Sequence, residues 1–228
     1  MDILNTLTLK SNRHIKINFD GGDLSSDAGL LLLKEFAAKI GFTKLIKRIF
    51  KTNDKSIRFH KDDENLMQMI YQIIAAYFED DCADELALDP VFNAILEKDS
   101  LASQPTLSRF FNRMDEDTLL QFDDIDKSLR NIIYAIKRPE HMLLDLDSTL
   151  FGTYGHQEGE GFNFHYQAHG YHPLLCYDGL TGDLLKAELR DGTLHCSNNA
   201  DKFMEPLFQE YMERGIKISV VTVDSHLL

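Results

Sequence analysis

The chain has 228 residues, of which 43% are hydrophobic and 27% are charged. These proportions are typical of folded globular proteins, and the length suffices for one large or two small domains with a buried core. No run of about 18 apolar residues predicts a membrane span, and the formal net charge of −13 argues against easy binding to nucleic acid.

The three cysteines are Cys82, Cys176 and Cys196, far apart in sequence and without a C-x-x-C spacing. An odd number at such distances favours reduced thiols over a disulfide framework. Residues 1–19 contain no apolar signal core with a small-residue cleavage site. The chain is therefore expected in the cytoplasm.

The amino-terminal part, residues 1–138, is predicted to be a mainly helical domain. Ser25 or Ser26 is a candidate N-cap for a helix over residues 27–40, and Gly41 is expected to end this helix. Its apolar stripe is predicted to consist of Leu30, Leu33, Ala37 and Ile40.

A second helix is predicted over residues 63–79, followed by shorter helices that start near Cys82 and at Pro90. The apolar side chains of the second helix are Leu66, Met69, Ile70, Ile73, Ile74 and Tyr77. Arg138-Pro139 marks the expected domain boundary, because proline interrupts the helical pattern there.

A further helix is predicted after Ser103, with Pro105 in its first turn, where a missing N–H is harmless. A short helix, a turn and this second helix are consistent with a helix-turn-helix that reads DNA. The candidate DNA-contacting residues are Gln104, Thr106, Ser108, Arg109 and Arg113. A plain helical domain is the alternative.

Basic residues cluster between positions 44 and 61, where Asp54 supplies the acidic side chain. The cluster consists of Lys44, Lys47, Arg48, Lys51, Lys55, Arg58 and Lys61. Local clustering of lysine and arginine, rather than the total charge, promotes DNA binding. A solvated surface of a helix and a loop explains the same pattern equally well.

The pattern changes at HMLLDLDST, which starts at His141 and alternates with a period of two. Asp145 and Asp147 fall together on one face of this predicted strand. The opposite, apolar face is predicted to contain Met142, Leu144, Leu146 and Leu150. A strand that buries one face and carries two carboxylates on the other suggests a functional reason for the acids.

The following elements are two more strands, a helix and a fourth strand. Their expected ranges are 171–178, 184–190, 200–214 and 217–224, with Asn198 or Asn199 capping the helix and Phe203, Leu207 and Tyr211 on its apolar face. Short turns favour antiparallel pairing of the first three strands, and the helix crossover favours parallel pairing of the fourth. The predicted fold class is therefore mixed α+β or α/β: a helical domain, then over residues 139–228 the first part of a ribonuclease H-like β-β-β-α-β sheet.

Ribonuclease H-like enzymes hold two metal ions between carboxylates of the first and fourth strands. Two cations neutralise the charge that develops on the attacking and leaving oxygens of a phosphodiester, and carboxylates suit Mg²⁺. Asp147 and Asp224 are the candidate ligands on these strands. Asp145 competes with Asp147 but is interpreted as a structural acid, and Glu158 is a candidate extra ligand.

The loop after the first strand is rich in glycine and histidine. Its histidines and those just beyond it are His156, His165, His169, His172 and His195. Only His165 and His169 have the spacing of a zinc-binding helix, and their glycine-flanked context has little helical character. A polar loop, with some histidines near a phosphate backbone, is favoured over a structural zinc site.

Several segments resemble the DDE-type transposases of bacterial insertion sequences. They are DLDSTLFGTYGHQEG (145–159), GYHPLLCYDGLTGDLL (170–185), LRDGTLHCSNNA (189–200), VDS (223–225) and, nearer the start, SSDAGLLLLKEFAAKIG (25–41) and QPTLSRFFNR (104–113). The most similar subgroup has a D-x-D-S/A-T strand followed by a G-x-Q-E-G loop. The resemblance extends over roughly residues 18–225.

The resemblance implies that Asp147 and Asp224 are the first two catalytic acids. It implies Mg²⁺, with Mn²⁺ as a substitute, and DNA partners in the form of terminal inverted repeats and target DNA, with a possible homo-oligomer. The third acid of the family, a glutamate, has no counterpart, and Asp224-Ser225-His226 departs from the usual Asp-Ser-Gly-Phe. The chain is therefore interpreted as carboxy-terminally truncated.

The expected function is DNA transposition through metal-dependent strand cleavage and strand transfer, with negligible activity expected for this chain alone because its third acid is missing. The alternative is a non-catalytic remnant that binds DNA or inhibits full-length subunits. A nuclease of another kind is a weaker third reading, since the same order of strands serves many nucleases.

Overall fold

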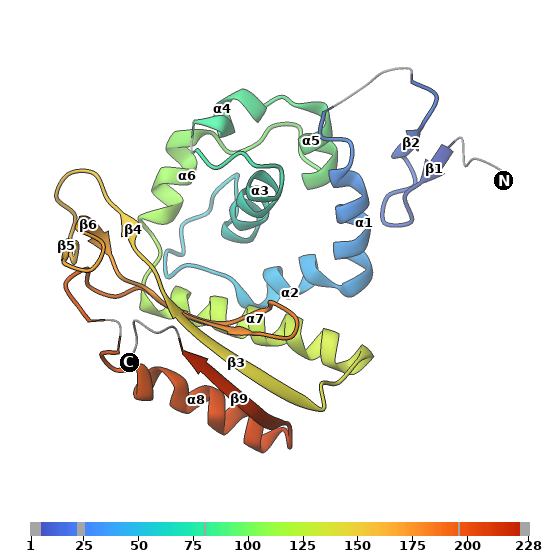
Figure 1. The fold of residues 1–228 in the computed structure, drawn as a ribbon. Helices are drawn as coiled ribbons and strands as arrows, with labels where there is room; N and C mark the ends of the chain where they lie inside the picture. The colour runs from blue at the N-terminus through green and yellow to red at the C-terminus, as the bar shows by residue number, and fades with distance from the viewer. Residues whose placement is uncertain (1–5, 22–25, 80, 196, 224–228) are drawn as a thin grey trace. The chain divides into compact units, whose positions relative to one another are not determined.

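The computed structural model describes residues 6–21, 26–79, 81–195 and 197–223, except the side chains of Val220, Thr222 and Val223. The chain divides into two compact units, Met1–Ile132 and Ile133–Leu228 (Figure 1). Over the described residues, no helix combines the length and the apolar character that a membrane crossing requires.

The first unit is mainly helical. Its elements are the antiparallel pair β1 (Thr6–Thr8) and β2 (Lys16–Asn18), then α1 (Leu30–Ile40), α2 (Phe42–Ile49), α3 (Asp62–Ile74), α4 (Cys82–Leu86), α5 (Pro90–Leu96), α6 (Gln104–Phe111) and most of α7 (Glu116–Ile136). Figure 1 shows α3 in the middle of this unit, with α1, α2, α4, α5 and α6 around it. The apolar core of the unit includes Ile46, Tyr71, Phe92 and Phe110.

The prediction for the start of α1 was wrong, whereas the prediction for its end is confirmed. The helix begins at Leu30, and the Ser26 hydroxyl donates to Asp27 instead of capping a helix. Ser25, the other candidate cap, lies outside the described residues. Gly41 ends α1 in the left-handed conformation with φ 76°, and its N–H is directed to the carbonyls of Ala37 and Ala38. Glycine adopts this conformation without steric cost.

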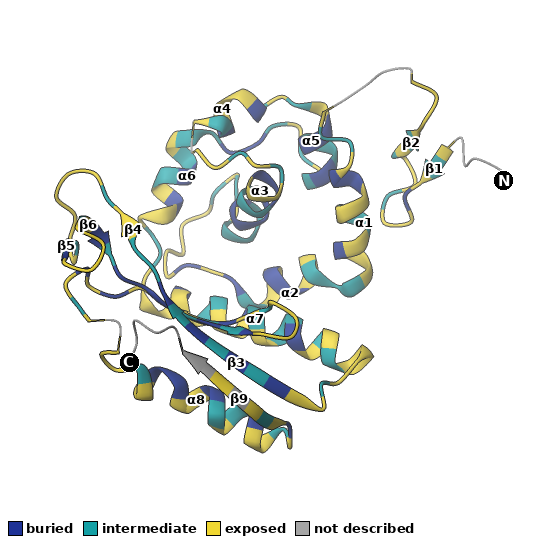
Figure 2. Ribbon diagram, in the orientation of Figure 1, coloured by how far each residue is buried: buried dark blue, intermediate teal, exposed yellow. Residues whose placement is uncertain are grey.

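The central helix α3 buries only part of the predicted apolar face. Leu66 is buried, and Met69, Ile70 and Tyr77 pack partly buried against the core, but Ile73 and Ile74 are 54% and 52% exposed. The buried residues of α3 are Asn65, Leu66, Met67, Gln68, Tyr71 and Gln72. Because helices surround α3 on most sides, polar amides are buried with the apolar side chains (Figure 2).

Gln68 shows how a buried amide is accommodated in α3. Its Nε2 donates to the carbonyl of Ala102 over 2.9 Å, and its Oε1 accepts the Ala102 N–H over 2.8 Å. These two bonds replace the water that the amide loses on burial. The helix ends at Ile74, before the predicted end at Glu79, and Ala76 turns the chain with φ 68°.

The second unit contains a four-stranded and a three-stranded sheet. Its elements are β3 (His141–Ser148), β4 (Phe151–Gly152), β5 (Gly161–Asn163), β6 (Ala168–Tyr171), β7 (Leu174–Asp178), β8 (Leu184–Glu188), α8 (Ala200–Glu213) and β9 (Lys217–Val223). The larger sheet has the order β8-β7-β3-β9, with β9 parallel to β3 and the other pairs antiparallel. The predicted mixed β-β-β-α-β fold class is confirmed.

One face of β3 is buried as the alternation predicts. Met142, Leu144 and Leu146 are almost fully buried and pack in the same core as Leu207 and Tyr211 of α8 (Figure 2). The prediction for Leu150 was wrong, because β3 ends at Ser148 and the buried serine occupies the last position of that face. Asn199 precedes α8 with φ 57° and makes no side-chain cap.

The glycine- and histidine-rich segment contains the three-stranded sheet β4-β6-β5, which was predicted to be a loop. Its strands have only two to four residues each. Glycine and histidine are poor indicators of a strand, and segments this short show no clear alternation. The sheet positions His169 and Tyr171 on β6.

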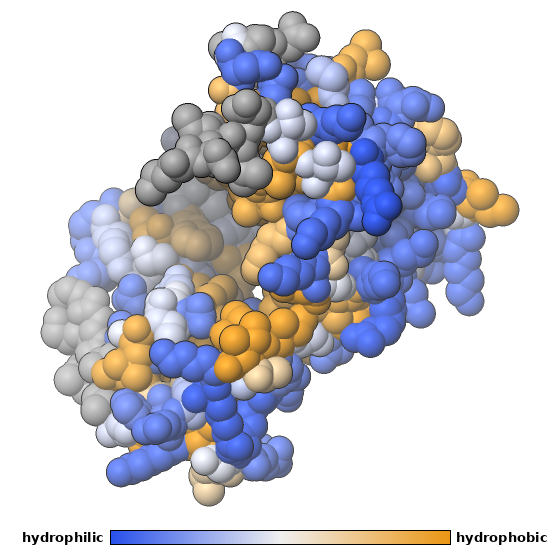
Figure 3. Space-filling model, turned by 90° about the vertical axis from the view of Figure 1, so that its right-hand side faces the viewer, coloured by the Kyte–Doolittle hydropathy of each residue, from blue (hydrophilic) through white to orange (hydrophobic). Residues whose placement is uncertain are grey.

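Exposed apolar side chains occur in both units. On the face in Figure 3, hydrophobic side chains reach the surface in patches between hydrophilic ones. The most exposed large apolar residues in helices or helix-flanking turns include Phe78, Leu88 and Ile136, each more than 70% exposed. Isolated exposures of this kind are normal in folded proteins.

Candidate active site

The candidate acids on β3 lie on the face opposite the α8 core. Asp145 and Asp147 are both half-buried and alternate with the buried Leu144 and Leu146. The Asp147 Oδ1 accepts the backbone N–H of Ser148 over 2.7 Å. This bond fixes the carboxylate at the carboxyl end of the strand.

Asp145 lies close to a buried cysteine of the neighbouring strand. In the register of β3 with β7, Asp145 lies opposite Tyr177, next to Cys176 in the chain. Burial, and after it the nearby carboxylate of Asp145, raises the pKa of the Cys176 thiol to about 12. The Cys176 side chain packs in the α8 core, on the face of the sheet opposite Asp145. The interpretation of Asp145 as a structural acid stays a prediction.

The strand β9 brings the end of the described chain beside β3. The parallel register pairs Asp145 with Thr222 and Leu146 with Val223. Asp224, the second candidate acid, is the next residue and lies outside the described residues. Asp147 is likewise the residue that follows Leu146.

Glu158 and Glu160, in the segment after β4, make different contacts. Glu158 is exposed, and its backbone carbonyl accepts the Tyr171 hydroxyl over 2.7 Å. The carboxylate of Glu160 is largely buried and lies 3.0 Å from His169 Nδ1. Glu158 as a metal ligand therefore stays a prediction. Within the described ranges, no group of three or more His, Cys, Asp or Glu side chains is arranged to hold a metal ion.

The structure adds residues that the sequence did not indicate. Tyr166 donates its hydroxyl to the backbone carbonyl of Ser148 over 3.1 Å, directly after Asp147. Ser148 and Tyr166 line a pocket of about 360 Å³ together with His172. No local pattern could indicate this contact, because it joins residues 18 positions apart through the small β4-β6-β5 sheet.

The comparison with protein families identifies the family of the chain. Residues 7–227 match the model described as transposase DDE domain group 1. The chain belongs to this transposase family. No curated protein matches the chain.

A solved structure with some similarity to this transposase domain is a cryo-EM structure of a piggyBac transposase synaptic complex with hairpin DNA. The similarity covers 82% of this chain and 47% of that chain, with 13% sequence identity and a TM-score of 0.32. The chain thus spans about half the length of that protein.

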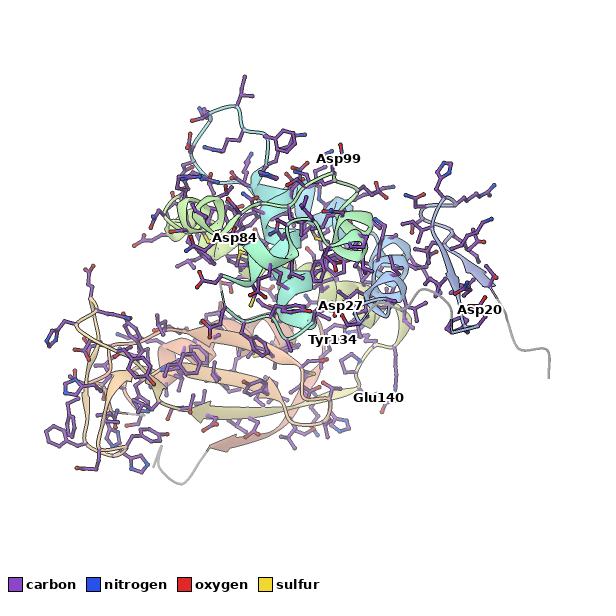
Figure 4. The ribbon with its side chains drawn as sticks, turned by 90° about the horizontal axis from the view of Figure 1, so that it is seen from above. Asp20, Asp27, Asp84, Asp99, Tyr134 and Glu140 are labelled. Atoms are coloured by element: carbon purple, nitrogen blue, oxygen red, sulfur yellow. The ribbon has the colours of Figure 1, made fainter. Side chains whose placement is uncertain are left out.

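Of the predicted DNA-contacting residues of this transposase domain, Gln104, Thr106 and Arg109 lie on α6, whereas Arg113 lies in the turn that follows it. Gln104 begins α6, and its backbone N–H donates to Asp84 of α4 over 2.9 Å (Figure 4 labels Asp84). Thr106 bonds the Ser103 hydroxyl over 3.1 Å. Arg109 is exposed, with its Nη2 3.4 Å from the Thr106 hydroxyl.

Arg113 is held by the protein itself. Its Nη2 donates to Asp62 Oδ1 over 2.9 Å, and its Nη1 donates to the carbonyl of Arg109 over 2.9 Å. Helix α6 contacts α3 and α4, and residues 97–103 separate it from α5. A helix-turn-helix usually has a turn of three to four residues, so DNA readout by α6 stays a prediction.

Proposed function

We propose that this transposase domain cleaves DNA strands and transfers them to target DNA with a divalent metal ion held by Asp147 and Asp224. The observation that carries the proposal is the parallel register of β3 and β9. It pairs Leu146 with Val223, and each candidate acid is the next residue in the sequence. Membership of the DDE family supports the reaction class.

The donor set fits a hard cation. Carboxylate oxygens are the ligands that Mg²⁺ and Mn²⁺ prefer, and the bond from the Ser148 N–H to Asp147 Oδ1 restricts the rotation of that carboxylate. A bound divalent ion supplies charge stabilisation at the phosphate and activates a water or hydroxyl nucleophile. In this proposal Asp145 is a structural acid, and Glu158 is a candidate extra ligand.

The proposed partner is DNA, namely the terminal inverted repeats of an insertion sequence and the target. Membership of the transposase DDE domain family supports DNA as the ligand class, and a homo-oligomeric assembly is part of the same proposal. We propose that Gln104, Thr106 and Arg109 on the exposed side of α6 contact the duplex. Arg113 is proposed to support α6 through Asp62 rather than to bind DNA strongly.

The test is strand cleavage by the purified chain on duplex DNA, measured with Mg²⁺, with Mn²⁺ and with chelator. Asp147→Asn removes the proposed metal ligand, and Asp145→Asn removes an equal charge from the same strand face. Cleavage that needs metal and is lost in Asp147→Asn but retained in Asp145→Asn supports the proposal. Cleavage that survives in Asp147→Asn contradicts it.

The same assay distinguishes the alternative function. DNA binding without cleavage by this chain, combined with inhibition of a full-length transposase, favours a non-catalytic DNA-binding role. This is the outcome expected if two carboxylates do not suffice for metal positioning. Titration of Mn²⁺ followed by electron paramagnetic resonance then reports whether Asp147 still binds metal.

A further inference from the structure

The pocket next to β3 is built from residues that are distant in sequence. It has a volume of about 360 Å³ and is lined by Ser148, by residues 163–166 and 172, and by residues 193–195. The Asn163 side chain fixes its frame: Nδ2 donates to the carbonyl of Gly192, and Oδ1 accepts the N–H groups of His165 and Tyr166. The positions of the lining side chains are therefore set by buried hydrogen bonds rather than by a loose loop.

His172 lines this pocket and carries a buried hydrogen-bond acceptor. The residue is 3% exposed, and its Nδ1 lies 2.8 Å from the carbonyl of Leu194. A carbonyl only accepts, so Nδ1 carries the proton and Nε2 carries a lone pair. Among the described residues, the buried Nε2 has no hydrogen-bond partner.

The neutral state of His172 follows from its surroundings. Burial lowers the pKa of His172, and the nearby charges of Arg190, His165 and His195 lower it further, against the bond to Leu194. A neutral imidazole with a buried lone pair needs a ligand that donates a hydrogen bond. None of the described lining residues carries a carboxylate.

Part of the remaining wall is aromatic. The Tyr166 ring meets the His172 ring edge to face at 5.7 Å and the His165 ring at 4.7 Å. Tyr166 is 37% exposed, so part of its ring is open to a ligand. Aromatic side chains stack on nucleic-acid bases of any sequence.

We propose that this pocket takes the base of one unpaired nucleotide in the DNA strand that lies at Asp147. The proposal rests on the proposed function, because Ser148 both lines the pocket and follows Asp147. Every DNA base has an N–H donor on its pairing edge that His172 Nε2 can accept, and an extruded base exposes that edge. The Tyr166 ring supplies a stacking surface, so the pocket accepts any base.

The experiment measures binding of a short duplex with one unpaired terminal 2-aminopurine nucleotide, in Ca²⁺ to prevent cleavage. The fully paired duplex, and a duplex with an abasic residue at the unpaired position, are the reference ligands. Tyr166→Leu removes the stacking ring and is expected to weaken binding of the unpaired duplex about tenfold. Its matched control is Tyr154→Leu, in the preceding loop, where the tyrosine is 95% exposed and does not line the pocket.

Two conservative variants separate the contacts. His172→Asn keeps an N–H donor for the Leu194 carbonyl but lacks the distal acceptor, and we expect several-fold weaker binding. Tyr166→Phe keeps the ring and loses the hydroxyl with its bond to Ser148, and we expect nearly unchanged binding. Thermal unfolding of each variant confirms that the unit is folded.

The outcomes distinguish this inference from the proposed function. Weaker binding in Tyr166→Leu and His172→Asn, confined to the duplex with the unpaired base and accompanied by loss of the 2-aminopurine quenching, supports the pocket. Equal binding of the unpaired and abasic duplexes overturns the pocket and leaves DNA cleavage at Asp147 intact. Absence of binding to any of the three duplexes overturns both.

Discussion

At the scale of single residues, Asp62 joins three segments of the helical unit. Its Oδ2 accepts the backbone N–H and the hydroxyl of Thr52, over 3.1 Å and 2.7 Å. Its Oδ1 lies 2.9 Å from Nη2 of Arg113, in the turn after α6. Burial opposes ionisation of Asp62, but the bonds from Thr52 and Arg113 outweigh burial and lower its pKa.

This shift makes stability depend on pH. A carboxylate whose pKa is lower in the folded state stabilises the fold above its unfolded pKa of about 3.9, and the contribution disappears as pH falls through the folded pKa. Asp62→Asn should therefore cost about 2 kcal/mol at pH 7, because Arg113 loses its partner. The difference from wild type should shrink towards pH 3, measured by urea unfolding. Asp63→Asn, which removes the same charge from the same helical turn, should show neither effect.

Cys176 is predicted to be chemically inert in the folded protein. With a pKa of about 12, roughly one thiol in ten thousand is ionised at pH 8, and the thiolate is the reactive form. Iodoacetamide at pH 8 should label the half-buried Cys82 and leave Cys176 unlabelled until denaturant is added, as read by peptide mass spectrometry. If iodoacetamide labels Cys176 in the native protein as fast as Cys82, the Cys176 thiol is accessible, and its predicted inertness is contradicted.

At the scale of elements, the β4-β6-β5 sheet depends on close approach between backbones. A Cβ added to Gly192 would lie 1.9 Å from the Gly170 carbonyl oxygen and 2.8 Å from the backbone of Gly161. No flexible side chain can move away from these contacts. Gly192→Ala should therefore destabilise the second unit by about 3 kcal/mol, measured by denaturant unfolding, because the backbone must shift.

Gly152 in β4 provides the matched control for this substitution. A Cβ there would meet nothing within 4 Å, and Gly152→Ala should leave stability within about 0.5 kcal/mol of wild type. Equal effects of the two alanine substitutions would contradict the packing of Gly192 against β5 and β6. The backbone movement caused by Gly192→Ala should also reduce the volume of the pocket lined by Asn163, because the Asn163 side chain donates to the Gly192 carbonyl.

The elements that the sequence predicts best are those with a strong period. The alternation in HMLLDLDST gives β3, its buried face and the shared face of Asp145 and Asp147, because a half-buried strand forces that pattern on its residues. The apolar spacing of Phe203, Leu207 and Tyr211 similarly gives α8 and its buried face. Sheet pairing follows, since short turns and one helical crossover leave few arrangements.

The elements that escape prediction depend on contacts between distant residues. The buried face of α3 includes Gln68, whose burial requires the Ala102 backbone 34 positions away. Arg113 looks like a DNA contact in sequence, but Asp62 binds it across 51 positions. For the candidate site, the sequence indicates the acids and, as one of several loop histidines, His172. It does not indicate Tyr166, because only the folded chain brings this side chain to Ser148.

At the scale of the whole molecule, the charge of −13 sets a condition on DNA binding. Several basic side chains are already paired with acids inside the helical unit, among them Arg58 with Asp62 and Lys98 with Glu64. These pairs contribute little to an external field. Binding must therefore use exposed basic residues, such as Arg109 on α6 and Lys47 and Arg48 on α2.

The salt dependence of binding tests the role of Arg109. Each phosphate that a basic side chain neutralises releases counterions, so the slope of log affinity against log salt reports the number of such contacts. Arg109→Ala should weaken binding of a duplex and reduce the slope by about one if the guanidinium contacts phosphate. Lys39→Ala removes a charge from an exposed site on α1 and should leave the slope unchanged. Equal slopes for wild type and Arg109→Ala between about 50 and 200 mM salt would exclude α6 as the phosphate-binding helix. The exposed basic side chains of α2 would then be the next positions to substitute.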